Sequence, residues 1–116
     1  MCIRDRTSCY TIERNCDDFK TGSFKSSIII DAKAYESHFV RTSSLQIETF
    51  EGKTDSSTVR WINNCEVIFK TINPKNRAER KDIHLKILTT TDSSYTFEYS
   101  YVGEVNKQKG TAIKIK

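Results

Sequence analysis

Proline, glycine and the strong helix-forming residues are scarce in this chain of 116 residues. It contains one proline and four glycines, and alanine, leucine and methionine together number 8. Valine, isoleucine, threonine and the aromatic residues together number 43, and these side chains suit a pleated sheet. The composition therefore argues against a helical bundle and predicts a β domain.

Long apolar runs are also missing. The longest aliphatic run is residues 28–30, all isoleucine, whereas a membrane-spanning helix needs about 20 apolar residues. Disorder is excluded too, because 36% of the residues are hydrophobic and 10% are aromatic, which is too much apolar surface to leave in water. The length fits a single domain.

The motifs that mark common catalytic and metal sites are absent. There is no Cys-x-x-Cys pair, no glycine-rich phosphate loop, no Gly-x-Ser-x-Gly and no His-Glu-x-x-His,. We expect the two histidines, His38 and His84, to be solvated on strand surfaces. Asp17 and Asp18 are adjacent, so on an extended chain they would point to opposite sides. We therefore expect no enzyme activity, no catalytic residue, no metal site and no cofactor.

From Phe19 onward, apolar residues recur with a period of two, and turn residues interrupt them about every ten residues, as in all-β barrels and sandwiches. Short links favour antiparallel neighbours. The long connection at 73–81 has room for one helical turn at 76–80. The eight expected strands are 22–30, 35–42, 44–50, 58–62, 65–69, 83–87, 95–101 and 112–116.

These strands predict an all-β fold, an antiparallel up-and-down meander that forms a small barrel or half-barrel. A two-sheet sandwich is the alternative, since it needs the same alternation. Within the strand at 44–50 we expect Leu45 and Ile47 to face inward and Gln46 and Glu48 outward. The polar residues 55–57 are expected to belong to the preceding turn.

The N-terminus differs from the rest. Residues 1–6 resemble the translation of a sequencing adapter joined to a truncated gene, although a genuine unstructured start would also fit. Ser8-Cys9 resembles the end of a bacterial lipoprotein signal, in which the cysteine carries the lipid. We accordingly interpret 7–18 as a lipoprotein-type junction and tether and 19–116 as the β domain. An ordinary exposed cysteine is the alternative for Cys9.

Cys16 and Cys65 are the pair that we expect to form a disulfide, since lipoprotein-type export places the domain where disulfides persist. Cys16 precedes the first strand and Cys65 begins a central one. Closing a loop of about 50 residues stabilises a fold by roughly 4 kcal/mol in the chain-entropy model. A metal site and a catalytic thiol are the rival interpretations, and both lack neighbouring partners.

Two groups of residues could contact a ligand. The hairpin at 70–86 holds six basic and two acidic residues; we expect a solvated loop, with contact to polyanions second and nucleic acid disfavoured because the loop lacks aromatic residues. An aromatic stripe offers apolar surface with polar tips. The possible polyanion contacts are Lys75, Arg77, Arg80 and Lys81, and the possible ligand-lining residues are Trp61, Tyr95, Phe97, Tyr99 and Tyr101.

Several segments resemble a family of small exported bacterial proteins of the lipoprotein type, in which members are sometimes labelled DNA topoisomerase IV. They are Glu-Arg-Asn-Cys at 13–16, Asp-Phe-Lys-Thr-Gly at 18–22, Val-Arg at 40–41, Glu-Gly-Lys-Thr-Asp at 51–55, Arg-Trp-Ile-Asn at 60–63 with Cys65, and Ser-Tyr-Thr-Phe-Glu-Tyr at 94–99. The resemblance implies a signal that ends in Ser8-Cys9 and no established activity. The topoisomerase label has no support here, since 116 residues cannot hold an ATPase module and a DNA-gripping domain.

We expect a monomeric, non-enzymatic domain of the cell envelope, periplasmic or associated with the outer membrane. Its partners would be the membrane, through a lipid on Cys9, and an envelope protein or a small ligand. The alternative is a lipocalin-like carrier that uses the barrel interior; residues 22–24 (Gly-Ser-Phe) resemble the Gly-x-Trp that opens lipocalins. An apolar cavity of about 300 Å³ or more favours the carrier, and a packed interior favours the envelope domain.

Overall fold

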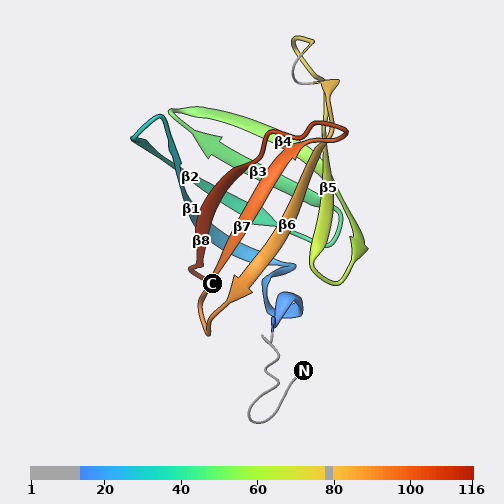
Figure 1. Cartoon of the computed structure of the whole chain (residues 1–116). Helices are drawn as coiled ribbons and strands as arrows, with labels where there is room; N and C mark the ends of the chain where they lie inside the picture. Colours follow the sequence, from blue (N-terminus) through green and yellow to red (C-terminus); the bar gives the residue numbers. More distant parts are fainter. Residues whose placement is uncertain (1–13, 78–79) are drawn as a thin grey trace.

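The computed structural model describes residues 14–77 and 80–116. This part of the chain forms eight β-strands, preceded by the short 3₁₀ helix η1 (Cys16–Phe19) (Figure 1). The strands are β1 (Gly22–Ile30), β2 (Lys33–Arg41), β3 (Leu45–Phe50), β4 (Lys53–Asn63), β5 (Glu66–Thr71), β6 (Ile83–Thr90), β7 (Ser94–Tyr101) and β8 (Gln108–Lys114).

The sheet is a closed barrel. Each strand pairs antiparallel with its neighbours along the chain, and β8 returns to pair with β1, where Ala112 lies opposite Ser26. This confirms the predicted antiparallel meander and selects the barrel over the half-barrel and the two-sheet sandwich. Closure gives both terminal strands a hydrogen-bonded neighbour on each side, so the described sheet has no free edge.

Two-residue turns join β1 to β2 and β3 to β4. Asp31 and Ala32 have φ angles of 52° and 65°, and Glu51 and Gly52 have 50° and 79°. Turns with two positive φ angles match the twist of a hairpin. Strand β4 starts directly after its turn, so residues 55–57 belong to a strand and the prediction of a loop there was wrong. The reason is that β3 pairs with them along its length.

The two ends of the barrel differ (Figure 1). We call one end the floor: it contains η1 and the connections 42–44, 64–65 and 91–93. We call the other end the mouth: it contains the connections 31–32, 51–52, 72–82 and 102–107. The basic connection between β5 and β6 therefore lies at the mouth, where its backbone closes one turn by an Arg80 N–H bond to the Arg77 carbonyl at 3.2 Å.

Aromatic rings fill the interior next to the floor. Phe19 of η1 lies 5.2 Å from Tyr95 and 6.5 Å from Phe24, measured between ring centroids. All three side chains are at most 1% exposed. Burying a side chain of this size stabilises a fold by about 1.5–3 kcal/mol. Packing against β1 and β7 therefore holds this short helix in place, because one 3₁₀ turn has little stability of its own.

Strand β3 faces opposite to the prediction. Leu45 and Ile47 are 39% and 44% exposed, while Gln46 and Glu48 face the interior and line a cavity there. The register explains this: Ile47 lies directly opposite the exposed Val40, and residues directly opposite share one face of a sheet. Pairing with β2, rather than the hydrophobicity of β3 itself, fixes which side faces inward.

On strand β8, too, the pairing with a neighbouring strand decides which side chains face inward, and their hydrophobicity does not. Ala112 is fully buried opposite Tyr95, whereas Ile113 and Ile115 are 50% and 56% exposed. A small side chain on β8 leaves room for the tyrosine ring across the pair. In the described part of the chain, no helix is both long enough and apolar enough to cross a membrane.

Candidate functional site

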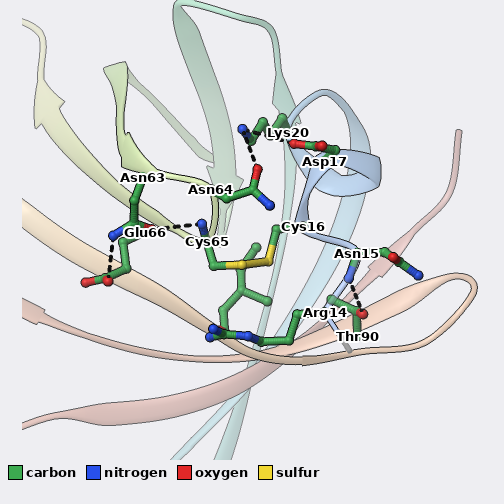
Figure 2. Close-up of a disulfide and its surroundings, with 11 residues drawn as sticks. Arg14, Asn15, Cys16, Asp17, Lys20, Asn63, Asn64, Cys65, Glu66 and Thr90 are labelled. Atoms are coloured by element: carbon green, nitrogen blue, oxygen red, sulfur yellow. Dashed lines mark hydrogen bonds and ion pairs between the residues drawn. A yellow bond between two sulfur atoms is a disulfide. The ribbon is translucent and has the colours of Figure 1, made fainter. Parts of the chain in front are cut away.

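Cys16 and Cys65 form the predicted disulfide (Figure 2). Their Cα atoms lie 5.4 Å apart, and both side chains are buried at the floor. The turn before β5 presents Cys65, because the Asn63 side-chain oxygen accepts a hydrogen bond from the Cys65 backbone N–H at 2.9 Å. The bridge therefore ties η1 to the start of β5.

The residues just before η1 also pack on the floor. The Arg14 guanidinium donates a hydrogen bond to the Ile87 carbonyl at 3.1 Å. The Asn15 backbone N–H donates to the Thr90 hydroxyl at 2.9 Å (Figure 2). Of the segment interpreted as junction and tether, residues 14–18 are the described part. They are bound to β6 rather than projecting from the barrel.

One charged side chain, Arg41 at the end of β2, is buried within the described part of the chain, with 2% of its surface exposed. Its Nε donates to the Gln46 side-chain oxygen at 2.8 Å, Nη1 to the Phe19 carbonyl at 2.9 Å and Nη2 to the Tyr95 hydroxyl at 3.1 Å. All three acceptors are neutral. A single side chain thus links β2, β3, η1 and β7.

Aromatic rings surround this guanidinium. Its central carbon lies between 5.0 and 5.8 Å from four ring centroids, a spacing at which the electron-rich ring faces attract a cation. The rings belong to Phe24, Phe39, Trp61 and Phe69. Sequence reasoning missed Arg41 as a site residue, although the inward series Tyr35, Ser37 and Phe39, extended by one step, reaches it.

Two adjoining cavities lie inside the barrel, and a third of about 290 Å³ meets the deep one at Ile83 and Tyr99. The deep cavity has a volume of about 150 Å³ and the mouth cavity about 370 Å³. Ile28, Glu48 and Tyr99 line both, so the two adjoin at these residues. The deep cavity is also lined by Ser26, Phe39, Arg41, Gln46, Phe69, Ile83, Leu85, Tyr95 and Phe97. The mouth cavity is also lined by Ile30, Tyr35, Glu36, Ser37, Phe50 and Asp55.

A short polar chain crosses the wall of the deep cavity. The Ser26 and Ser37 hydroxyls lie 2.7 Å apart, and Ser37 donates to the Glu48 carboxylate at 2.8 Å. Asp55 lies directly opposite Glu48 on β4. Like charges in this position repel one another, so the junction of the two cavities carries a concentrated negative charge.

Tyr99 stands at the same junction. Burial raises its pKa above the ordinary value of 10.0, and the negative charge of Glu48 raises the pKa further. The hydroxyl is therefore protonated at neutral pH. It supplies a neutral polar tip beside two carboxylates.

The aromatic residues predicted to line a ligand site divide into three groups. Tyr95, Phe97 and Tyr99 line the deep cavity. Tyr101 lies at the mouth end of β7 and lines the third cavity, and the Lys81 ammonium stands 5.3 Å from its ring centroid. Trp61 packs against the core outside both cavities, and its indole Nε1 is buried without a hydrogen-bond partner in the described structure.

The basic residues predicted as polyanion contacts lie in the connection between β5 and β6 and are exposed. Lys81 forms an ion pair with Glu104 at 3.1 Å, which joins this connection to the one between β7 and β8. The full set is Lys75, Arg77, Arg80 and Lys81. Figure 1 shows that the connection between β5 and β6 projects from the mouth end of the barrel.

The two histidines lie in different surroundings. His38 is exposed, as predicted. His84 is not simply solvated: its Nε2 lies 2.7 Å from the Glu66 carboxylate, and both side chains are 26% exposed. A hydrogen bond from Asn63, with a further contribution from His84, lowers the pKa of Glu66 below its ordinary 4.5. Among residues 14–77 and 80–116, no three His, Cys, Asp or Glu side chains could hold a metal ion.

Cys9, predicted to carry a lipid, and residues 1–6, interpreted as adapter-derived, lie outside the described residues. The likeness to small exported proteins and the location in the envelope therefore stay predictions. In comparison with known proteins, no family model, no curated protein and no solved structure matches this chain.

Proposed function

We propose that this protein is a lipocalin-like carrier, which binds one small and mainly apolar molecule inside its barrel. The observation that carries the proposal is the unfilled interior, where a mouth cavity of about 370 Å³ adjoins a deep cavity of about 150 Å³. Pockets for small molecules begin at about 300 Å³.

The barrel has the form of a cup. Phe19 and the disulfide of Cys16 occupy the floor and are fully buried there. The mouth cavity lies at the other end, among Ile30, Tyr35 and Phe50. A ligand therefore enters and leaves at the mouth, and the floor keeps water from the deep cavity.

The walls suit an apolar body with few polar groups. Aliphatic and aromatic side chains make up most of the deep cavity. Among its polar members, Arg41 donates to Gln46 and Tyr95, and Ser26 and Glu48 are both hydrogen-bonded to Ser37. We propose a role in binding without catalysis. Both histidines occupy strand positions whose direct neighbours, Phe39 and Leu85, face the interior, so His38 and His84 face outward.

We further propose that the carrier works in the cell envelope. The Cys16–Cys65 bridge supports this location, since disulfides persist in oxidising compartments,. A lipid on Cys9 would attach the protein to a membrane. Mass spectrometry of the natural gene product tests the attachment, and a mature protein that lacks acyl chains on Cys9 overturns it.

Binding can be measured with a neutral fluorescent probe, N-phenyl-1-naphthylamine. Trp61 is the only tryptophan of the chain and packs beside Arg41, so energy transfer from its indole reports a probe inside the barrel. We expect saturable binding of one probe per chain. Ser26→Leu, which places a larger side chain in the deep cavity, should weaken binding at least about tenfold, since excluded apolar contact of this size is worth more than about 1.4 kcal/mol.

Ser27→Leu is the matched control. Ser27 adjoins Ser26 on β1 but belongs to an outer depression with Ile29 and Thr111. This variant adds the same volume outside the barrel and should leave probe affinity unchanged. If the two variants bind alike, or if the wild type shows no saturable binding, the proposed carrier function is wrong.

A further inference from the structure

The charge of Arg41 has no acidic partner in the part of the chain that the structure describes. Its guanidinium lines the deep cavity while 2% exposed, and its three hydrogen bonds go to an amide, a backbone carbonyl and a phenol oxygen. Within the described residues no carboxylate forms an ion pair with it. A guanidinium has five N–H donors, and three of them bond to the described residues, so two have no acceptor among those residues.

The surrounding rings compensate this charge only in part. Ring faces attract the cation, but a buried charge without a counter-ion still lacks what water would supply. An anion in the deep cavity would meet a desolvated guanidinium with free donors. Arginine and carboxylate geometries match in two parallel hydrogen bonds, and such charge-assisted bonds are among the strongest in proteins.

The two cavities limit the size of the ligand. A cavity of 150 Å³ is large enough for a benzene ring, and the deep cavity has about this volume. The mouth cavity adds about 370 Å³, in which Ile28, Ile30 and Phe50 offer apolar surface. The carboxylates of Glu36, Glu48 and Asp55 also line it. Together they suit a charged group at Arg41 with an apolar body that extends toward the mouth.

We infer that the bound molecule is a monoanionic amphiphile, a carboxylic acid with an apolar body of about medium-chain length, whose carboxylate pairs with Arg41. This inference rests on the proposed carrier function and specifies its ligand class. Glu48 and the opposite residue Asp55 narrow the class of ligand further, because both are negatively charged. A second negative charge on the body of the ligand would lie beside these two carboxylates, so dianions are disfavoured.

The first experiment compares ligands rather than variants, because Arg41 variants can lose the fold. Decanoate, decan-1-ol and decylamine are titrated into the wild-type protein at neutral pH, below their aggregation concentrations, by calorimetry. Decanoate should bind at least about tenfold more tightly than decan-1-ol, the gain of a charge-assisted hydrogen bond to a desolvated group. Decylamine should bind more weakly than either.

The second experiment removes the negative charge of Glu48, which lines both cavities. Glu48→Gln removes a negative charge near the deep cavity without touching Arg41, so it should tighten decanoate binding about three- to tenfold and leave decan-1-ol unchanged. Glu98→Gln is the matched control. Glu98 lies on the outer face of β7, paired with Lys107, and its loss should change neither ligand.

The outcomes separate the inference from the function on which it rests. If decan-1-ol binds as tightly as decanoate, the carboxylate inference is overturned and the carrier function stands. If decylamine binds most tightly, the inference is overturned and the carboxylates of Glu48 and Asp55 select a cation instead. If none of the three binds, both proposals fall.

Discussion

Among single residues, Arg41 connects more of the barrel than any other described above. It carries hydrogen bonds to η1, β3 and β7 from a position on β2. A lysine could not replace it, because an ammonium is a point charge without the planar fork that reaches three separate acceptors. The aromatic floor and the arginine therefore depend on one another.

Replacing Arg41 with methionine should lower the free energy of unfolding by about 2–4 kcal/mol. The change keeps an apolar side chain of similar length but leaves the Phe19 carbonyl, the Gln46 amide oxygen and the Tyr95 hydroxyl without their donor, and each buried group left unpaired costs about 1–3 kcal/mol. Urea unfolding followed by circular dichroism measures the difference.

Arg60→Met on β4 is the control for this experiment. Arg60 is exposed, and substitutions of exposed residues usually change stability by no more than about 0.5 kcal/mol. If Arg41→Met proves as stable as Arg60→Met, then relief of the buried charge offsets the lost hydrogen bonds. The account of Arg41 as a structural link would then be wrong.

At the scale of secondary-structure elements, η1 is held in three ways. Phe19 packs into the aromatic floor, Arg41 binds its carbonyl, and Cys16 is bonded to the start of β5. The disulfide joins residues 49 positions apart in sequence. In the chain-entropy model a link of this length restricts the unfolded chain more than a short one does.

The double variant Cys16→Ala/Cys65→Ala should be less stable than the wild type by about 2–4 kcal/mol, the usual effect of removing a native disulfide. Thermal unfolding checks this, and wild-type protein treated with a reductant should reproduce the lowered transition temperature. The strand pairing of the barrel should persist at low temperature, and η1, still held by Phe19 and Arg41, should become more open to proteolysis. Equal transition temperatures for variant and wild type would show that the bridge is not needed to hold the floor.

Much of the element order could be predicted from alternation alone. Apolar residues recur at alternate positions in the strands that contain Phe24, Val67 and Phe97. Residues such as Gly52 mark the hairpin turns. To predict that the barrel is closed, one must also know that β1 pairs with β8. That pairing joins distant segments and leaves no local signal in the sequence.

The interior polar residues could not be predicted in the same way. On β3, hydrophobicity favoured Leu45 and Ile47 as the inner side, yet the pairing with β2 turns Gln46 inward, where it accepts a hydrogen bond from Arg41. Burial of polar side chains depends on partners from other strands. The sequence of a single strand therefore predicts which residues share a face, but it does not predict which face points to the interior.

On the scale of the whole molecule, closure makes all eight strands equivalent in one respect. Each strand of the described barrel has a hydrogen-bonded neighbour on both sides, including the terminal pair β1 and β8. Sheets with free edges expose rows of N–H and C=O groups that can recruit other chains. A closed barrel needs no charged or twisted edge strand to prevent this.

Amide hydrogen exchange should show this equivalence. Averaged over each strand, amides of β1 and β8 should be protected to the same extent as those of the central pair β4 and β5, since protection follows the free energy of opening. Nuclear magnetic resonance measures the rates. Exchange that is orders of magnitude faster along β1 and β8 than along β4 and β5 would indicate a barrel that opens at this seam.

Both ends of the described chain lie at the floor of the barrel, and this bears on how the mouth is oriented. Arg14, the first described residue, binds β6 there, and the last residue, Lys116, accepts a backbone hydrogen bond from Ser23 at 3.1 Å on the same end. If a lipid on Cys9 anchors the chain, as proposed, the mouth would be turned away from the bilayer. A molecule bound in the barrel would then be exchanged with the aqueous side, and a donor or acceptor protein would approach from that side.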